Sequence, residues 1–385
     1  MGIRGGTKNY LMTTVLGVPN SGISRVPLSK YRGKRVVIDW SNMAHRFLNR
    51  VETVLQLVNE FINLIHKFAR ERITIIFVFD GKPRDEKMVA IEHRKNVKSK
   101  AFDKISDIIA NVSNPDEDLK TIMHLARRVK TIKPSHMDEC KKLFDVFGIH
   151  YIHLEHIEAD CIFKFLLDND FADVCFSGDM DLLAYGCKYI IQDLDFKEDT
   201  IVEIDYNMLL THLRVSHQQL LMAFILSGTD WNNGLKKTNF SKNLEFIKKY
   251  GDIPSIIAVL DELNRDLPED RHVGLPVRFD WEFSVSVYTE VIAPDIVDVV
   301  ITQFQHQSKQ TETMQQHGFN VLLEYGKIVL ENDADLKYTK KYQQYVFWKY
   351  AFHLELIPHT NISSGCKTRA RYNSNSQQTQ KKLKN

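Results

Sequence analysis

Acidic residues recur in this chain at the points where short apolar runs end. Asp39 closes the run RVVID, Asp80 closes ITIIFVFD, and Asp179 and Asp181 follow the run VCFS. Asp230 stands just after the run LLMAFIL. Near-continuous runs of Val, Ile and Phe are typical of parallel strands that are covered on both faces. The sequence therefore predicts that carboxylates from separate segments stand at strand ends.

These apolar runs alternate with amphipathic helical stretches, and this alternation predicts the fold class. The predicted strands are 35–39, 73–80, 149–152, 174–177, 189–192 and 201–204, and the predicted helices between them include 51–69, 136–147 and 159–167. Alternating strands and helices indicate an α/β fold with a doubly wound, mostly parallel sheet.

Two regions depart from this alternation. The segment 96–133 has no strand pattern and has helically spaced apolar residues, so we expect a helical excursion from the sheet. It is rich in basic side chains, namely Lys98, Lys100, Lys104, Lys120, Arg127, Arg128, Lys130 and Lys133. Past Asp230 the pattern is helical, with a C-terminal extension expected over 261–358. The polar, basic tail 359–385 is predicted to be disordered.

In an open α/β sheet, ligands bind beyond the carboxyl ends of the strands. The acids listed above, together with Glu158 at the start of a helix, are therefore predicted to converge there. Taken singly, each acid is better explained as a helix N-cap, but six acids at five such positions are much harder to explain in that way. Gathered carboxylates repel one another, and burial raises their pKa values, so a divalent cation is expected among them. Two Mg²⁺ or Mn²⁺ ions about 4 Å apart are able to promote phosphoryl displacement.

Composition excludes several other classes of protein. The net charge is +2, so nucleic-acid affinity has to come from local patches rather than from the whole surface. The five cysteines form no CxxC pair, which favours a reducing compartment without structural zinc. No apolar run approaches the roughly 18 residues of a membrane helix. We expect a soluble, intracellular protein that makes no membrane contact.

Several strings resemble the flap endonuclease/XPG family of structure-specific 5′ nucleases. They are MGIRG, YRGKRVVID, FVFDGKP, GDMDLLAYG and ILSGTDW, in the family's order and spacing. The resemblance implies a PIN-like nuclease domain over about 1–260, two Mg²⁺ ions with Mn²⁺ as the alternative, and Gly2 near the active site and its nucleic acid. It implies that the metal ligands are Asp39, Asp80, Glu158, Asp179, Asp181 and Asp230.

The resemblance also implies roles for cationic residues. Lys87 and Arg94 stand seven and fourteen residues after Asp80, at the family's positions for stabilising the scissile phosphate. The segment 96–133 corresponds to the arch through which the family threads a single-stranded 5′ end. Its Lys98, Arg127 and Arg128 are expected to follow phosphates.

The chain departs from the family's pattern at three places. Aligned on Ala159, the first Glu of the family's Glu-rich motif is His156 here, so Glu155 or a water is expected to fill that ligand position. His45 replaces a base-stacking Tyr. The stretch corresponding to the helix–two-turn–helix, about 231–251, lacks the family's Gly-x-Gly hairpin. Its Lys236, Lys237 and Lys242 are expected to hold phosphates instead, without a K⁺ site.

The leading hypothesis is a monomeric nuclease acting on flap, nicked or gapped DNA in replication, repair or recombination. The alternatives are an RNA endonuclease related to viral mRNA-degrading enzymes, and a catalytically weakened nucleic-acid-binding scaffold. The tail QQTQKKLKN lacks the paired aromatics of the family's sliding-clamp motif, so clamp binding is not expected. A cellular protein of this kind would work in the nucleus, and a viral one at a cytoplasmic replication site.

Overall fold

A computed structural model describes residues 2–303 of the chain, apart from 52, 112–113, 155–156, 291 and 293–295. The predictions made for the later part of the C-terminal extension, up to 358, and for the tail 359–385 lie outside the described residues. So does the position of Glu155, the predicted substitute ligand, and that of His156 beside it.

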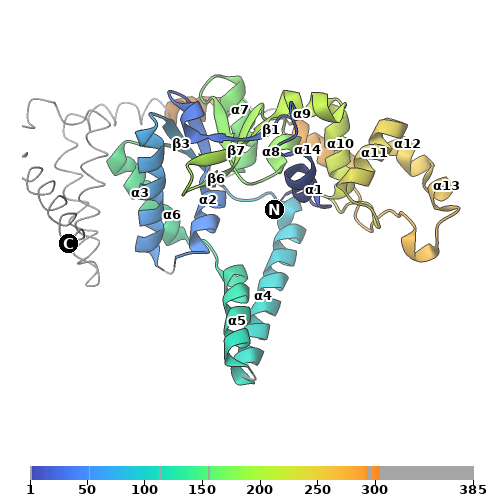
Figure 1. The fold of residues 1–385 in the computed structure, drawn as a ribbon, viewed down its shortest axis with the longest axis horizontal. Coiled ribbons are helices and arrows are strands. Elements are labelled where there is room, and N and C mark those ends of the chain that lie inside the picture. Colours follow the sequence, from blue (N-terminus) through green and yellow to red (C-terminus); the bar gives the residue numbers. More distant parts are fainter. Residues whose placement is uncertain are drawn as a thin grey trace, which may run out of the picture. The chain divides into compact units, whose positions relative to one another are not determined.

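The centre of the described part is a seven-stranded sheet with the order β1-β7-β6-β5-β2-β3-β4 (Figure 1). Five neighbouring strands, β6 to β4 in that order, are parallel, while β7 and β1 are antiparallel additions at one edge. The strands are β1 Ile23–Pro27, β2 Arg35–Asp39, β3 Thr74–Phe79, β4 His150–His153, β5 Val174–Phe176, β6 Tyr189–Asp195 and β7 Thr200–Asp205. The prediction of a mostly parallel α/β sheet is confirmed, and β1 is a strand that the sequence reading missed.

The order of the strands reverses between β2 and β5. From β2 the chain builds β3 and β4 outward on one side, and β5 and β6 lie on the other side. Val36 of β2 pairs with Ile75 of β3 and with Val174 of β5, so the carboxyl ends of these three strands lie at one edge of the sheet. A crevice beyond such a reversal is the usual ligand site of doubly wound folds.

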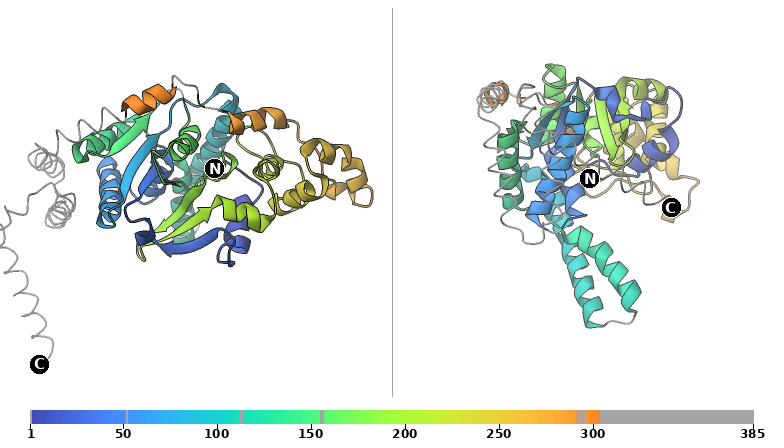
Figure 2. Two further views of the ribbon diagram at one scale, coloured as in Figure 1. Left: turned by 90° about the horizontal axis from the view of Figure 1, so that it is seen from above. Right: turned by 60° about the vertical axis from the view of Figure 1, so that its left-hand side comes forward.

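Helices cover both faces of the sheet (Figure 2). On one face α2, α3 and α6 pack around an aromatic cluster in which Phe77 and Phe144 stack at 4.2 Å between centroids. On the other face α7 packs against β2, β3 and β5, and α10 contacts α8. The bounds of these helices are α2 Trp40–Leu48, α3 Val54–Arg70, α6 Pro134–Phe147, α7 Ala159–Asp168, α8 Asp181–Ala184 and α10 His217–Ser227.

A helical hairpin projects from the body of the molecule (Figure 1). It consists of α4 Met88–Ala110 and α5 Pro115–Val129, which pack against each other. The excursion predicted at 96–133 therefore begins earlier, at Met88, because the helix continues directly from the short 3-10 turn η3, Asp85–Lys87. The base of α4 consequently lies near the carboxyl end of β3.

The described part of the chain after α10 consists mainly of helices and the loops between them. It contains α11 Phe240–Tyr250, α12 Ile253–Ala258, α13 Leu260–Asn264 and α14 Trp281–Thr289. The polar break at 261–274 holds the short turn η4, Glu269–Arg271, and little other regular structure. Among the described residues, no helix is both long and apolar enough to cross a membrane.

Candidate metal centre

The carboxyl ends of β2 and β5 are tied together by side chains of the predicted site. Asp39 caps α2, accepting the Asn42 N–H at 2.9 Å through Oδ1 and the Ser177 hydroxyl at 2.8 Å through Oδ2. The Asn42 side chain in turn accepts the Gly178 N–H at 3.0 Å. A capping Asp needs only one oxygen for its helix. The second oxygen is therefore available to fix the loop after β5, which carries the next two acids.

Asp179 and Asp181 follow β5 in a tight turn. The Asp181 N–H donates to the Asp179 carboxylate at 3.2 Å, and the Asp179 N–H donates to the Ser177 hydroxyl at 3.1 Å. Gly2 packs against both carboxylates. A Cβ added at Gly2 would lie 2.5 Å from Asp179 Oδ1 and would overlap the Asp181 carboxylate. Only a residue without a side chain fits there, and Gly2 thus lies against two of the predicted metal ligands.

A Gly2→Ala substitution is expected to displace these carboxylates and to lower the cleavage rate about 100-fold, the usual effect of misplacing reacting groups by about 1 Å. Single-turnover cleavage at several Mg²⁺ concentrations measures this effect. Gly274→Ala is the matched control, because a Cβ at Gly274 meets no atom within 4 Å. Equal rates for the two variants would contradict the placement of Gly2.

The third parallel strand brings Asp80 to the start of α7. Asp80 Oδ1 accepts the Ala159 N–H at 3.2 Å, and the Gly81 N–H donates to the Ile157 carbonyl at 3.0 Å. Glu158 is the N-cap residue of α7 and has extended backbone dihedrals, φ −72° and ψ 142°. The ends of β3 and α7 are thus joined, and the Glu158 side chain is buried beside them.

Asp230 is held by a compact loop after α10. Gly228 has φ +92°, which favours glycine, and its backbone lies against that of Gly234. Within the loop, Thr229 Oγ1 accepts the Trp231 N–H at 3.1 Å and donates to Asn232 Oδ1 at 3.0 Å. This buried turn fixes Asp230, which is 7% exposed.

Asp160 is a further acid of the site, and the sequence analysis did not select it. Burial and the charges of Asp179, Asp181 and Asp39 raise the pKa of Asp160 well above its ordinary value, although Lys87 opposes them. The alignment of the family's Glu-rich motif on Ala159 placed the second acidic ligand before Glu158, at Glu155. Glu158 precedes the helix in extended backbone, so the two carboxylates that the α7 start directs inward are two residues apart. The string EAD was the signal available in the sequence.

Two cations lie among the acids, as the sequence predicted. Lys87 Nζ is 2.8 Å from Glu158 Oε2 and 3.7 Å from Asp230 Oδ2, and it lies 5.3 Å from the ring centroid of Trp231. Arg94, on α4, pairs with Asp230. Burial lowers the pKa of Lys87, but the charges of Glu158 and Asp160 outweigh it and raise the pKa above its ordinary value. Lys87 therefore stays protonated.

The arrangement suits a hard divalent cation. Glu158 Oε1 and Asp181 Oδ1 are buried, and neither has a hydrogen-bond partner among the described residues. Burial and the charges of Asp179 and Asp230 raise the pKa of Asp181 well above its ordinary value. In the described part of the chain, no three acidic, imidazole or thiolate side chains already have the spacing of a closed metal site. The donor set is nevertheless all oxygen, which Mg²⁺ prefers.

The stability of the metal-free protein is expected to fall between about pH 4 and pH 7. Burial and the charge of Asp80 raise the pKa of Asp39 to about 7. In the unfolded chain the Asp39 carboxyl releases its proton at about pH 3.9. The folded state therefore binds more protons than the unfolded state between about pH 4 and pH 7, and raising the pH lowers the free energy of unfolding. Urea denaturation in EDTA at pH 5 and pH 8 measures the change. In Asp39→Asn the free energy of unfolding should depend less on pH. The same pH dependence as in the wild type would contradict the assignment to Asp39.

The predicted nucleic-acid contacts lie at several places around this centre. His45 is on α2, where burial and the charge of Lys98 lower its pKa, so the ring is neutral. Lys98 donates to Thr131 Oγ1 at 3.0 Å across the base of the hairpin. Arg127 and Arg128 belong to α5, but their side chains lie outside the described residues. The three lysines of the other predicted contact lie before and within α11, namely Lys236, Lys237 and Lys242.

Two family models match the chain. The XPG N-terminal domain matches residues 1–101, and the XPG I-region matches residues 148–230. Flap endonuclease 1 of Salmo salar is 27% identical over 266 residues, covering 65% of this chain and 68% of that protein. Flap endonuclease 1 of Methanococcus aeolicus is 27% identical over 245 residues, covering 60% and 72%. The chain thus aligns with roughly two thirds of each relative.

Solved structures share the fold. The catalytic core of Rad2 in complex with a DNA substrate superposes with a TM-score of 0.53 at 19% identity, covering 78% of this chain and 86% of that one. The junction-resolving enzyme GEN1 in complex with product DNA and Mg²⁺ gives a TM-score of 0.50 at 13% identity, covering 79% and 74%. Both XPG regions, the relatives and the acids gathered at the sheet edge agree: the chain belongs to the flap endonuclease/XPG family and is a nuclease, a hydrolase of phosphodiesters.

Proposed function

We propose that this nuclease cuts branched, nicked or gapped DNA in a reaction that depends on two divalent metal ions, with Mg²⁺ as the natural cofactor. The observation that carries the proposal is that acids from five separate segments of the chain meet at one place. Two of their carboxylate oxygens, Glu158 Oε1 and Asp181 Oδ1, are buried and have no hydrogen-bond partner among the described residues. The proposed ligands are Asp39, Asp80, Glu158, Asp160, Asp179, Asp181 and Asp230. Membership of a nuclease family speaks against a non-enzymatic scaffold.

Mg²⁺ bound there supplies positive charge that stabilises the phosphoryl transition state and lowers the pKa of the attacking water. The chain's own cations complete the site. Lys87 is protonated and 13% exposed, and its partner Glu158 is one of the proposed ligands. When cations take over the carboxylates, Lys87 and Arg94 are released to hold the scissile phosphate, where fixed positive charge is most effective.

The nucleic acid is proposed to reach this centre along the base of the hairpin. Lys98 on α4 and His45 on α2 flank Asp80, and their interaction with a single strand would combine phosphate contact with base stacking. The lysines before and within α11 are proposed to contact phosphates of the duplex. Rad2 and GEN1, which share the fold, were solved with DNA, and this favours DNA over RNA as the substrate.

The proposal extends to a monomer that works without a sliding clamp, inside the cell. DNA with flaps, nicks and gaps arises where genomes are copied and repaired. The expected site is the nucleus for a cellular protein, or a cytoplasmic replication site for a viral one.

Cleavage of a 5′-flap DNA and of a single-stranded RNA of equal length, in Mg²⁺ and in Mn²⁺, tests the substrate. Cleavage of the flap DNA, absent with EDTA and absent in Asp179→Ala, is the expected result. Cleavage of RNA alone would transfer the proposal to an RNA endonuclease. Tight binding of both substrates without cleavage in either metal would overturn it.

A further inference from the structure

A tyrosine outside the two XPG regions reaches the neighbourhood of the metal centre. Tyr288 lies on α14, which packs against α10, and it is 3% exposed. Its hydroxyl is buried and has no hydrogen-bond partner among the described residues. A buried polar group without a partner destabilises a fold, and such groups mark places where a water, an ion or a functional contact belongs.

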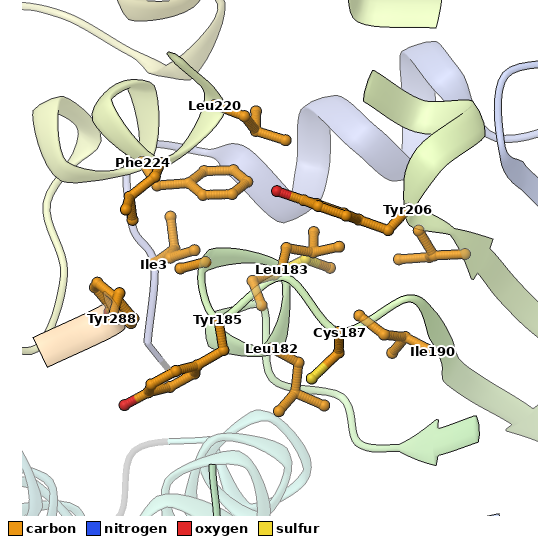
Figure 3. Close-up of a cluster of buried hydrophobic side chains, with 14 of the residues drawn as sticks. Ile3, Leu182, Leu183, Tyr185, Cys187, Ile190, Tyr206, Leu220, Phe224 and Tyr288 are labelled. Carbon is orange, nitrogen blue, oxygen red and sulfur yellow. The ribbon is translucent and has the colours of Figure 1, made fainter. Parts of the chain in front are cut away.

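The ring of Tyr288 is held by its neighbour Tyr185. The two rings meet edge to face, with centroids 5.0 Å apart and planes at 69° (Figure 3). The two phenols differ in one respect. The Tyr185 hydroxyl accepts a hydrogen bond from Cys161 Sγ at 3.5 Å, whereas the Tyr288 hydroxyl is unpaired within the described residues. Packing of the ring therefore accounts for the tyrosine at 185, but it leaves the hydroxyl at 288 unexplained.

Tyr288 packs on the segment that carries Asp181, because the N–H of its ring neighbour Tyr185 donates to the Asp181 carbonyl at 3.0 Å. Burial and, next, the charge of Asp181 raise the pKa of Tyr288 well above its ordinary value, and three further carboxylates of the centre act in the same direction. The phenol consequently stays protonated, so its O–H is able to donate to a carboxylate. Asp181 Oδ1 is itself buried, with no hydrogen-bond partner among the described residues. A buried donor and a buried acceptor thus stand on segments that Tyr185 joins, and neither has a partner in the described part of the chain.

We propose that Tyr288 is a positioning residue of the metal centre, whose hydroxyl donates a hydrogen bond to the Asp181 carboxylate, directly or through one water, and so orients it for Mg²⁺. The inference rests on the function proposed above. Carboxylates that bind metals are generally fixed by hydrogen-bond donors behind them, and loss of such a donor lowers metal affinity about 10- to 100-fold. The C-terminal helix α14 thereby acquires a role in the reaction.

Tyr288→Phe removes the hydroxyl and keeps the ring. Titration of Mg²⁺ into the protein without nucleic acid, followed by calorimetry, is expected to show Mg²⁺ binding weakened about 10-fold. The Mg²⁺ concentration for half-maximal cleavage should rise equally, with the rate at saturating Mg²⁺ retained. The melting temperature in EDTA should not fall, because the lost hydroxyl has no hydrogen-bond partner among the residues that the structure describes.

Tyr185→Phe is the matched control, since it removes the neighbouring, partnered hydroxyl, and it should leave Mg²⁺ affinity unchanged. Wild-type affinity in Tyr288→Phe, or an equal loss in both variants, would overturn the inference. Asp181→Ala separates this result from failure of the proposed function. If Asp181→Ala loses Mg²⁺ binding while Tyr288→Phe keeps it, only the role of Tyr288 is wrong. If Asp181→Ala also keeps it, the proposed metal centre is wrong.

Discussion

Asp181→Asn is expected to abolish most cleavage and, at the same time, to raise the melting temperature of the metal-free protein. Asp181 is 3% exposed, and its Oδ1 has no partner within the described structure. Burial, Asp179 and Asp230 all disfavour its charged form. A neutral amide of the same shape removes this repulsion, so we expect about 1 kcal/mol of added stability, or roughly 2–4 °C in melting temperature.

The same substitution removes a proposed metal ligand. Lewis-acid stabilisation of the transition state by a bound ion is worth several kcal/mol, and a loss of about 4 kcal/mol lowers the rate about 1000-fold. Thermal denaturation in EDTA and single-turnover cleavage in Mg²⁺ measure the two effects. Asp270→Asn, at an exposed acid in η4, should change neither. A lower melting temperature in EDTA, or cleavage at the wild-type rate, would count against the assignment of Asp181.

Lys87→Gln is expected to have the opposite effect on stability. Lys87 Nζ is 2.8 Å from Glu158 Oε2, with only 13% and 7% of the two side chains exposed. Removing one member of a buried pair leaves the other charge uncompensated and typically costs about 3–5 kcal/mol. We expect a loss near 3 kcal/mol in EDTA. Mg²⁺ should restore part of it, because a cation then compensates Glu158.

Cleavage by Lys87→Gln should fall about 100- to 1000-fold even at saturating Mg²⁺, as expected when a charge that stabilises the transition state is lost. Lys164→Gln provides the control for stability. Lys164 pairs with Asp168 at the surface, with 44% and 35% of the side chains exposed, and such pairs contribute about 1 kcal/mol or less. Equal destabilisation by the two substitutions, or none by Lys87→Gln, would show that the buried pair does not form.

The parallel strands were predictable because each is a near-continuous apolar run buried on both faces. The strand β1 was not predictable in this way, because an edge strand needs only one buried face. In Ile23–Pro27 the buried Ile23 is followed by Ser24 and Arg25, so the segment contains no continuous apolar run. The antiparallel pairing of β6 with β7 was also missed. The connection 196–199 is too short for the crossover that a parallel pair needs, so its length was the signal available in the sequence.

The acids of the centre could be selected from sequence because strand ends meet at one edge of a sheet. The residues that contact these acids could not be selected from the sequence. Asp160 was missed because the family's motif was aligned on Ala159, so the second acid was sought before Glu158. Asp160 instead lies in the first turn of α7, just after Glu158. The pairing of Arg94 with Asp230 joins residues 136 positions apart, and no local pattern reports it. Tyr288 lies in a region whose sequence carries no recognised motif. It was found through its buried hydroxyl, which has no hydrogen-bond partner among the described residues.

Arg94 belongs to the base of the projecting hairpin, while its partner Asp230 belongs to the metal centre. An ion that binds Asp230 competes with this contact, so occupancy of the centre and docking of the hairpin are thermodynamically linked. Such linkage is reciprocal: whatever strengthens or weakens the docked hairpin changes ion affinity by the same factor. A strand of nucleic acid that reorders α4 and α5 would therefore change the affinity of the centre for its metal ion, without contacting any of the metal ligands.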